Sequence, residues 1–194
     1  MRVVAGVLRS RTLRAPRGDA TRPTTDRVRE SLFAVLGDVH GAVVLDLYAG
    51  SGALAIEALS RGAATAVCVE SARAAVQTIR DNARDLGLQQ RLHVVARRVA
   101  ECGPALGAHA PFTLVFADPP WAMVPDGIAP REVATLLAAP GRLAEGATIV
   151  LEHAARDASP ALAGLVEIDA RRWGDTAVTI YQRAPRLPDA DAPP

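Results

Sequence analysis

The chain has 194 residues, of which 49% are apolar and 22% charged, and its net charge is +1. These values are typical of one domain, or of one domain with a small appendage, that buries a large core. No apolar run approaches the roughly 20 residues that cross a bilayer, and arginines interrupt the N-terminus too often for a secretory signal, so we expect no membrane partner.

The charge is distributed unevenly along the chain. Residues 1–30 hold eight arginines and three acidic residues, for a net charge of +5, whereas the remainder carries −4. An arginine-rich segment on a near-neutral body is typical of proteins that bind a phosphate-rich partner. We therefore predict a basic N-terminal arm over residues 1–20; a merely solvated basic tail is the alternative.

After the arm, strands and helices alternate. The apolar patterns predict helices over residues 25–36, 53–61, 72–87, 99–106 and 130–139, and strands over 42–50, 65–70, 91–96, 113–117 and 147–153. Residues 165–173 and 176–182 are two further strands that Gly174 and Asp175 join as a hairpin. Residues 184–194 are rich in Pro and Asp, and we expect a disordered tail there.

Repeated strand–helix units predict an α/β fold with a mostly parallel sheet, helices on both faces and a terminal antiparallel hairpin. Ligands bind such sheets beyond the carboxyl ends of the strands. Asp46, Glu70 and Asp118 each stand near the end of a predicted strand. We therefore expect these three carboxylates to be neighbours.

The first strand ends in DLYAGSGALA, residues 46–55, whose G-x-G-x-x-A pattern fits a nucleotide-binding turn. Glu70 follows Gly50 by 20 residues, at the spacing where an acid binds a ribose diol. Nicotinamide enzymes and methyltransferases share this pattern. Asp46 favours the second class, because a carboxylate there repels a pyrophosphate but attracts the ammonium and sulfonium of S-adenosylmethionine.

The fourth parallel strand ends in the stretch F-A-D-P-P-W, residues 116–121. Prolines end a strand and stiffen the backbone after it, so a simple acidic turn is one interpretation. The chemical interpretation is a site for an exocyclic amine of a base. Asp118 and the Pro119 carbonyl would accept hydrogen bonds from the amine, Pro120 would rigidify the loop, and Trp121 would stack on the base.

D-P-P-W resembles the (D/N)-P-P-(Y/F/W) motif of methyltransferases that act on adenine N6 or guanine N2. Together with TRPTTDRVRESLF (21–33), the stretch DLYAGSGALAIEALSRGA is similar to the bacterial ribosomal small-subunit methyltransferase D family, and the similarity extends to about residue 182. It implies a class I, Rossmann-like methyltransferase domain over 21–183 with seven strands and a small N-terminal basic β arm. It also implies methylation of N2 of a loop guanine in 16S rRNA, with S-adenosylmethionine as cofactor.

The resemblance assigns roles residue by residue. It implies that the residues which bind the target amine are Asp118, Pro119, Pro120 and Trp121. It implies that the residues which bind the cofactor are Asp46, Tyr48, Gly50, Gly52, Glu70 and Val99. Val99 would do so through its backbone N–H, because Arg98 stands where relatives often carry Asn or Asp. The RNA-facing set comprises Arg9, Arg11, Arg14, Arg22, Arg27 and Arg29.

The remaining expectations follow from patterns that the sequence lacks. Cys68 and Cys102 stand alone and the four histidines show no ligand spacing, so we expect a reduced cytoplasmic protein without a metal site. Its partner would be 16S rRNA, the small ribosomal subunit or an assembly intermediate, bound by a monomer. An adenine-N6 methyltransferase, a nicotinamide-dependent oxidoreductase and a non-catalytic RNA-binding module remain alternatives.

Overall fold

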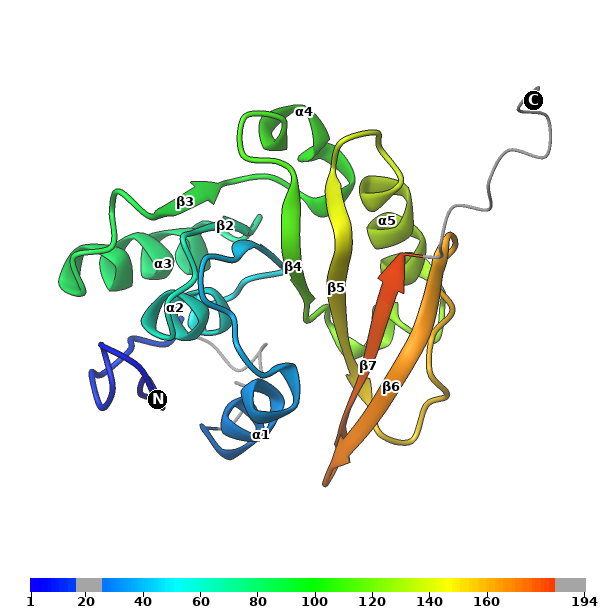
Figure 1. The fold of residues 1–194 in the computed structure, drawn as a ribbon, viewed down its shortest axis with the longest axis horizontal. Coiled ribbons are helices and arrows are strands. Elements are labelled where there is room, and N and C mark those ends of the chain that lie inside the picture. The colour runs from blue at the N-terminus through cyan, green and yellow to red at the C-terminus, as the bar shows by residue number, and fades with distance from the viewer. Residues whose placement is uncertain (17–25, 184–194) are drawn as a thin grey trace, which may run out of the picture.

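The computed structural model describes residues 1–16 and 26–183, which form one sheet covered by helices on both faces (Figure 1). The strands, in chain order, are β1 (Val43–Leu47), β2 (Thr65–Val69), β3 (Leu92–Val95), β4 (Phe112–Ala117), β5 (Leu143–Ala154), β6 (Leu165–Trp173) and β7 (Thr176–Arg183). The helices are α1 (Asp26–Leu36), α2 (Ala53–Ser60), α3 (Arg73–Asp85), η1 (Val99–Glu101), α4 (Gly103–Leu106), η2 (Trp121–Met123) and α5 (Ile128–Leu137).

The sheet has seven strands in the order β3-β2-β1-β4-β5-β7-β6. Strands β1 to β5 pair in parallel, whereas β7 pairs antiparallel with both β5 and β6. The hairpin turns at Gly174, whose φ of 63° lies in the left-handed region that glycine adopts at no steric cost. The predicted mixed α/β sheet with a terminal antiparallel hairpin is confirmed.

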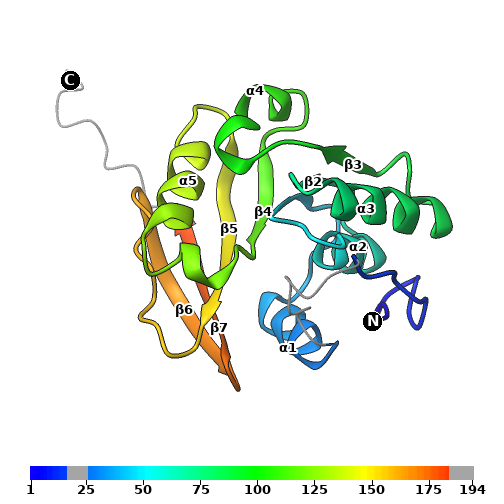
Figure 2. The same cartoon turned by 180° about the vertical axis from the view of Figure 1, so that it is seen from behind.

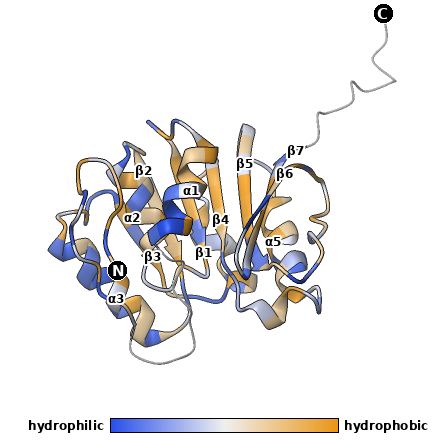
Figure 3. Cartoon of the chain, turned by 90° about the horizontal axis from the view of Figure 1, so that it is seen from below, coloured by the Kyte–Doolittle hydropathy of each residue, from blue (hydrophilic) through white to orange (hydrophobic). Residues whose placement is uncertain are grey.

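One apolar cluster lies on each face of the sheet. One cluster joins α1, α2 and α3 to the sheet and includes Phe33, Ile56 and Ile79, and the other joins η1, α4 and α5 and includes Leu106 and Val133. Figure 2 shows the sheet from behind, and Figure 3 shows apolar residues concentrated in its strands. Strands β1, β2 and β4 are buried almost throughout because both their faces are covered.

Several predicted boundaries shift by one to three residues, and two departures are larger. Strand β5 begins at Leu143 rather than at residue 147, because Leu143 already pairs with Phe112 of β4. The single helix expected over 99–106 is divided into η1 and α4, where Gly103 and Pro104 begin a new turn. In the part of the chain that the structure describes, no helix combines the length and apolarity that a membrane span requires.

The N-terminal arm folds back on itself and lies on α2. One antiparallel bridge, between Arg2 and Thr12, joins its two halves, so the arm is a looped segment rather than a continuous β ribbon. The N–H groups of Val4 and Ala5 donate to the Glu57 carboxylate at 2.7 and 2.9 Å. The described part of the arm, residues 1–16, is therefore packed onto the domain.

Gly6 sets how closely the arm approaches α2. A Cβ at this position would stand 1.9 Å from the Ser60 carbonyl oxygen, and the φ of Gly6 is +79°. Any side chain would therefore push the arm away from the helix. The neighbouring Val7 N–H donates to the same Ser60 oxygen at 2.8 Å, which explains the tight approach.

Candidate cofactor and target-base site

The carboxylates of Asp46, Glu70 and Asp118 lie close together at the rim of the sheet, which is formed by the carboxyl ends of β1, β2 and β4, because these strands end in register. Leu47 is paired with Val69 of β2 and with Ala117 of β4, so the residues after these positions lie side by side. The Asp118 N–H continues the ladder by donating to the Leu47 carbonyl at 3.3 Å. Asp118 and Glu70 thus stand next to the turn that leaves β1, as the strand-end rule predicts.

Asp46 is the buried member of this group, with 1% of its surface exposed. Its Oδ2 accepts a hydrogen bond from the Ala55 N–H at 3.1 Å, in the first turn of α2. Burial raises the pKa of Asp46 well above its usual range, and the negative charges of Asp118 and Glu70 raise it further against the effect of that hydrogen bond. A positively charged ligand beside this carboxyl group would favour its ionised form and so lower its pKa again.

The glycine turn, residues 48–52, holds two glycines for different reasons. Gly50 has a φ of +56°, and a Cβ there would meet only the Tyr48 carbonyl oxygen, at 4.0 Å. Gly52 is buried, and a Cβ there would lie 3.3 Å from Ile79 and 3.7 Å from Cys68. Gly50 therefore borders open space that a ligand can occupy, whereas Gly52 allows the turn to pack against α3.

Glu70 ties the glycine turn to β2. Its Oε2 accepts from the Gly50 N–H at 2.9 Å, and its Oε1 accepts from the N–H groups of Ser71 and Ala72 at 2.7 and 2.8 Å. A carboxylate offers about four lone-pair sites, so one remains for a further donor such as a ribose hydroxyl. Glu70 is thus both a structural brace and an available acceptor.

Tyr48 points away from the turn toward α5. Its φ is 58°, and its hydroxyl donates to Glu132 Oε2 at 2.7 Å. Burial, followed by this hydrogen bond and the Glu132 charge, raises the pKa of Tyr48. The phenol therefore anchors the turn, and Glu132, which no sequence pattern indicates, is its partner. Any cofactor contact by Tyr48 would come from its ring or backbone.

The D-P-P-W stretch connects the end of β4 to the first residue of η2. Asp118 is half-buried, Pro119 is buried and Pro120 is exposed. The Pro120 carbonyl accepts from the Met123 N–H at 2.8 Å, which closes a 3-10 turn that begins at Trp121. Trp121 is half-buried, so part of its indole surface remains accessible beside the rim.

Val99 begins η1, after the short loop that follows β3. The Val95 carbonyl accepts from both the Glu70 N–H and the Arg97 N–H, at 3.1 and 3.0 Å, which fixes the loop before η1. The Val99 side chain is buried. As the first residue of η1, Val99 has an N–H that its own helical turn does not use, in keeping with a backbone contact to a cofactor.

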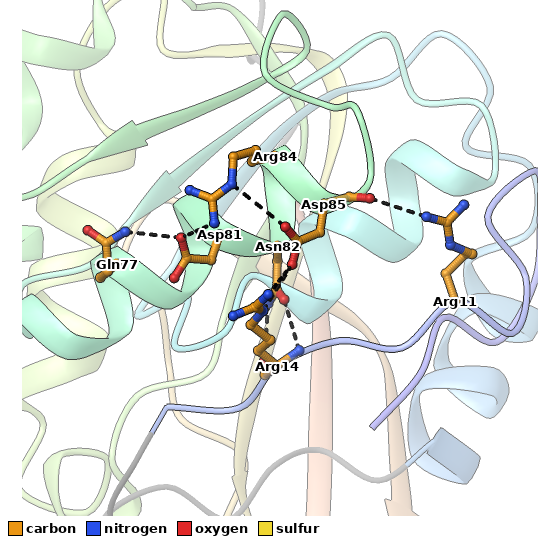
Figure 4. Close-up of polar contacts among 7 residues, drawn as sticks. All are labelled: Arg11, Arg14, Gln77, Asp81, Asn82, Arg84 and Asp85. Atoms are coloured by element: carbon orange, nitrogen blue, oxygen red, sulfur yellow. Dashed lines mark hydrogen bonds and ion pairs between the residues drawn. The ribbon is translucent and has the colours of Figure 1, made fainter.

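The six arginines of the predicted RNA-facing set lie in different environments. Arg9 and Arg27 are exposed. Arg11 donates to the Asp85 carbonyl at 3.2 Å, and Arg14 pairs with the Asp85 carboxylate at 2.7 Å (Figure 4). Arg22 lies outside the described residues.

Arg29 is the position at which the structure departs from the predicted set. It is fully buried, and its Nη2 donates to the Arg2 carbonyl at 2.6 Å and to Asp26 at 2.8 Å. Its guanidinium holds the N-terminal arm against α1. It has no surface to offer to RNA, so we remove it from the set.

Other candidate sites lie elsewhere or lack ligands. A hollow of about 460 Å³ lies along the edge strand β3 and is lined in part by Arg80, His93 and His109. Neither the glycine turn nor Asp118 lines this hollow. The candidate site is therefore identified by its converging hydrogen-bond donors and acceptors and not by the size of a cavity. Within residues 1–16 and 26–183, no group of three or more His, Cys, Asp or Glu side chains is arranged to hold a metal ion.

Comparisons with known proteins agree with this geometry. The family model described as "Conserved hypothetical protein 95" matches residues 1–182. The Ribosomal RNA small subunit methyltransferase D of Escherichia coli (strain K12) is 37% identical, with 94% of this chain and 90% of that protein covered.

Two solved structures are also similar. A hypothetical protein of Thermus thermophilus has 33% identity and a TM-score of 0.75, with 93% of this chain and 98% of that chain covered. An RNA methyltransferase of Salinibacter ruber, solved with S-adenosyl-L-homocysteine, has a TM-score of 0.65 at 18% identity, with 87% and 97% covered; this likeness concerns the fold.

Proposed function

Because the chain belongs to the ribosomal small-subunit methyltransferase D family, we propose that it methylates N2 of a loop guanine in 16S rRNA with S-adenosylmethionine as donor. The observation that supports this proposal is that Asp46, Glu70 and Asp118 lie together where β1, β2 and β4 end; there they would bind the methionine end of the cofactor, its ribose and the target amine, respectively. Methylation of rRNA is the activity that the family itself supports; the guanine N2 target is our more specific proposal.

The residues present fit the cofactor. Bound S-adenosylmethionine supplies an electrophilic methyl group on a sulfonium. In its ionised form the buried Asp46 carboxylate would pair with the positive charge of its methionine end, and Gly50 leaves open the space that a Cβ would narrow. Glu70 has an acceptor site left for the ribose, and the Val99 N–H is available to the adenine.

Asp118 and its neighbours would prepare the guanine amine. The lone pair of this nitrogen is delocalised into the ring, which makes it a poor nucleophile. Asp118 would accept a hydrogen bond from N2–H and stabilise the positive charge that develops on N2 as the new N–C bond forms and the bond from the methyl carbon to sulfur breaks. The proton would then pass from N2 through the Asp118 carboxylate to solvent. The Pro119 carbonyl would accept from the second N–H, and Trp121 would hold the base flat.

The target is an unpaired base, because the guanine amine of an RNA duplex is engaged in pairing and sequence-specific recognition favours loops. Arg9 and Arg27 are the exposed members of the predicted set whose side chains make neither a hydrogen bond nor an ion pair with the described residues, whereas Arg11 and Arg14 are held by Asp85. They are therefore the best candidates for phosphate contacts.

The decisive experiment measures transfer of a labelled methyl group to 16S rRNA and to small subunits, followed by identification of the modified nucleoside. We expect N2-methylguanosine at one position. N6-methyladenosine would replace the guanine target with the adenine alternative. Binding of NADH but not of S-adenosylhomocysteine would favour an oxidoreductase, and RNA binding without transfer would favour a non-catalytic module.

Trp121→Ala should weaken turnover more than cofactor binding. Stacking of a base on an aromatic ring contributes about 1–3 kcal/mol, which corresponds to roughly 5- to 150-fold in kcat/KM for RNA. Steady-state kinetics with RNA and cofactor varied in turn would measure both effects. Trp121→Phe keeps an aromatic face and should retain most activity. An unchanged rate for the alanine variant would remove the stacking role.

Replacing Arg9 and Arg27 together with alanine should reduce the salt dependence of RNA binding. If each contacts one phosphate, the slope of log K against log salt should become shallower by about 1.4. Filter binding over a range of KCl concentrations would measure it. The paired variant Arg11→Ala with Arg14→Ala is the matched comparison, and we expect a smaller change because Asp85 already engages both side chains. Equal slopes for wild type and the Arg9 and Arg27 variant would locate the phosphate contacts elsewhere.

A further inference from the structure

Asn82 of α3 is buried, and its amide makes three hydrogen bonds to two distant segments. Its Oδ1 accepts from the Arg14 N–H at 2.8 Å, and its Nδ2 donates to the Arg14 carbonyl at 3.1 Å. The same Nδ2 donates to the Ser51 carbonyl at 3.0 Å. Only 2% of the residue is exposed, so water does not readily replace these bonds.

These bonds join the N-terminal arm directly to the glycine turn. Ser51 stands between Gly50 and Gly52, and Arg14 lies 68 residues from Asn82 in sequence. A second contact reinforces the junction, because the Ser51 hydroxyl donates to Met1 Sδ at 3.5 Å while the Leu13 N–H donates to the Met1 carbonyl at 3.0 Å. The arm therefore reaches Ser51 twice, directly through Met1 and through the Asn82 amide from Arg14.

The other anchors of the arm do not reach this turn. Glu57 and Ser60 hold residues 4–8 on α2. The Arg14 guanidinium forms an exposed ion pair with Asp85, which Figure 4 shows beside Asn82. Arg14 is thus bound by two residues of α3. Asn82 also donates a hydrogen bond to Ser51 of the glycine turn, whereas Asp85, among the described residues, is not bonded to that turn.

We propose that Asn82 is a positioning residue that couples RNA binding on the arm to cofactor binding at the glycine turn, an inference that rests on the proposed function. RNA that fixes the arm around Arg14 also fixes the Asn82 amide, and through it the Ser51 carbonyl beside Gly50. Coupling between two binding sites is reciprocal, so each ligand raises the affinity for the other by the same factor.

The test is equilibrium dialysis of labelled S-adenosylhomocysteine, with and without saturating 16S rRNA or unmethylated small subunits. For the wild-type protein we expect RNA to raise the affinity for S-adenosylhomocysteine by about 5-fold or more, the lower range of typical couplings. Asn82→Ala should bring this ratio close to one. A structural role alone would change the stability of the arm but not the ratio between the two measurements.

Asp85→Asn is the matched control, because it weakens the other anchor of Arg14 without touching Ser51, and it should keep the wild-type ratio. Should Asn82→Ala fail to fold, Asn82→Asp retains the acceptor for the Arg14 N–H, loses the donor to Ser51, and should also lower the ratio. A wild-type ratio of one, an unchanged ratio in both Asn82 variants, or an equal loss in Asp85→Asn would overturn the coupling role. Absence of wild-type binding to S-adenosylhomocysteine or to RNA would overturn the proposed function itself.

Discussion

Asp118→Ala should lower kcat by about 10²–10⁴-fold while leaving the affinity for S-adenosylhomocysteine nearly unchanged. The reason is positional. Asp118 follows β4 on the shared rim and would touch the target amine, whereas the cofactor would contact Asp46, Gly50 and Glu70. Single-turnover methyl transfer gives the rate, and isothermal titration gives the cofactor affinity.

Asp118→Asn is the informative companion variant. Asparagine keeps one carbonyl acceptor for N2–H but loses the negative charge, so its rate should fall between those of wild type and Asp118→Ala. It also occurs in the (D/N)-P-P-(Y/F/W) motif that this chain resembles. A large loss of cofactor affinity in Asp118→Ala would mean that Asp118 belongs to the cofactor site instead.

Asp46→Asn should weaken cofactor binding by roughly 10- to 150-fold, because it removes a charge-assisted interaction of about 1.5–3 kcal/mol. The substitution is close in shape, and the asparagine carbonyl can still accept from the Ala55 N–H, so the turn should remain intact. Isothermal titration with S-adenosylhomocysteine measures the loss. Wild-type affinity in this variant would show that no cationic group lies against Asp46.

The pH dependence of cofactor binding provides a second readout of Asp46. Burial and the charges of Asp118 and Glu70 raise its pKa, so the apo protein retains this proton to an unusually high pH. A cationic ligand binds the carboxylate form, and therefore affinity should rise as pH increases through the raised pKa. The amide that Asp46→Asn introduces does not titrate, so the affinity of this variant should lack the rise.

The same shift predicts how Asp46 affects stability. Its pKa is higher in the folded chain than in the unfolded chain, so the folded state binds the proton more tightly. The free energy of unfolding should consequently decrease as pH rises from the ordinary carboxyl range through the raised pKa. Urea unfolding of the two apo proteins should therefore show that, over this pH interval, the free energy of unfolding of Asp46→Asn increases relative to that of the wild type. A constant difference between them would contradict the raised pKa.

Much of the fold and of the rim could be predicted from local pattern. Short apolar runs bounded by Gly and Pro identified the strands, and the rule that parallel sheets bind ligands beyond their carboxyl ends predicted that Asp46, Glu70 and Asp118 meet. The register of Leu47 with Val69 and Ala117 brings them together as expected. The order of the strands in the sheet, by contrast, was not predicted.

The partners of individual polar side chains were not predictable. Arg29 occupies an ordinary helical position, yet it is fully buried and its guanidinium donates to the Arg2 carbonyl of the arm. Glu132 and Asn82 belong to no motif, yet they hold Tyr48 and Ser51 from 84 and 31 residues away. In the sequence Arg11 and Arg14 resemble free basic residues, but in the fold α3 brings Asp85 beside them.

The sequence by itself determined the elements, the glycine turn and the chemistry at the strand ends, because backbone conformation and residue type act over a few neighbouring positions. The tertiary structure alone decided which arginines remain free, which glycine borders open space and how the arm reaches the turn. Those features depend on hydrogen bonds and burial between segments that lie far apart in the chain, and the packing of α1, α2 and α3 against the arm creates them.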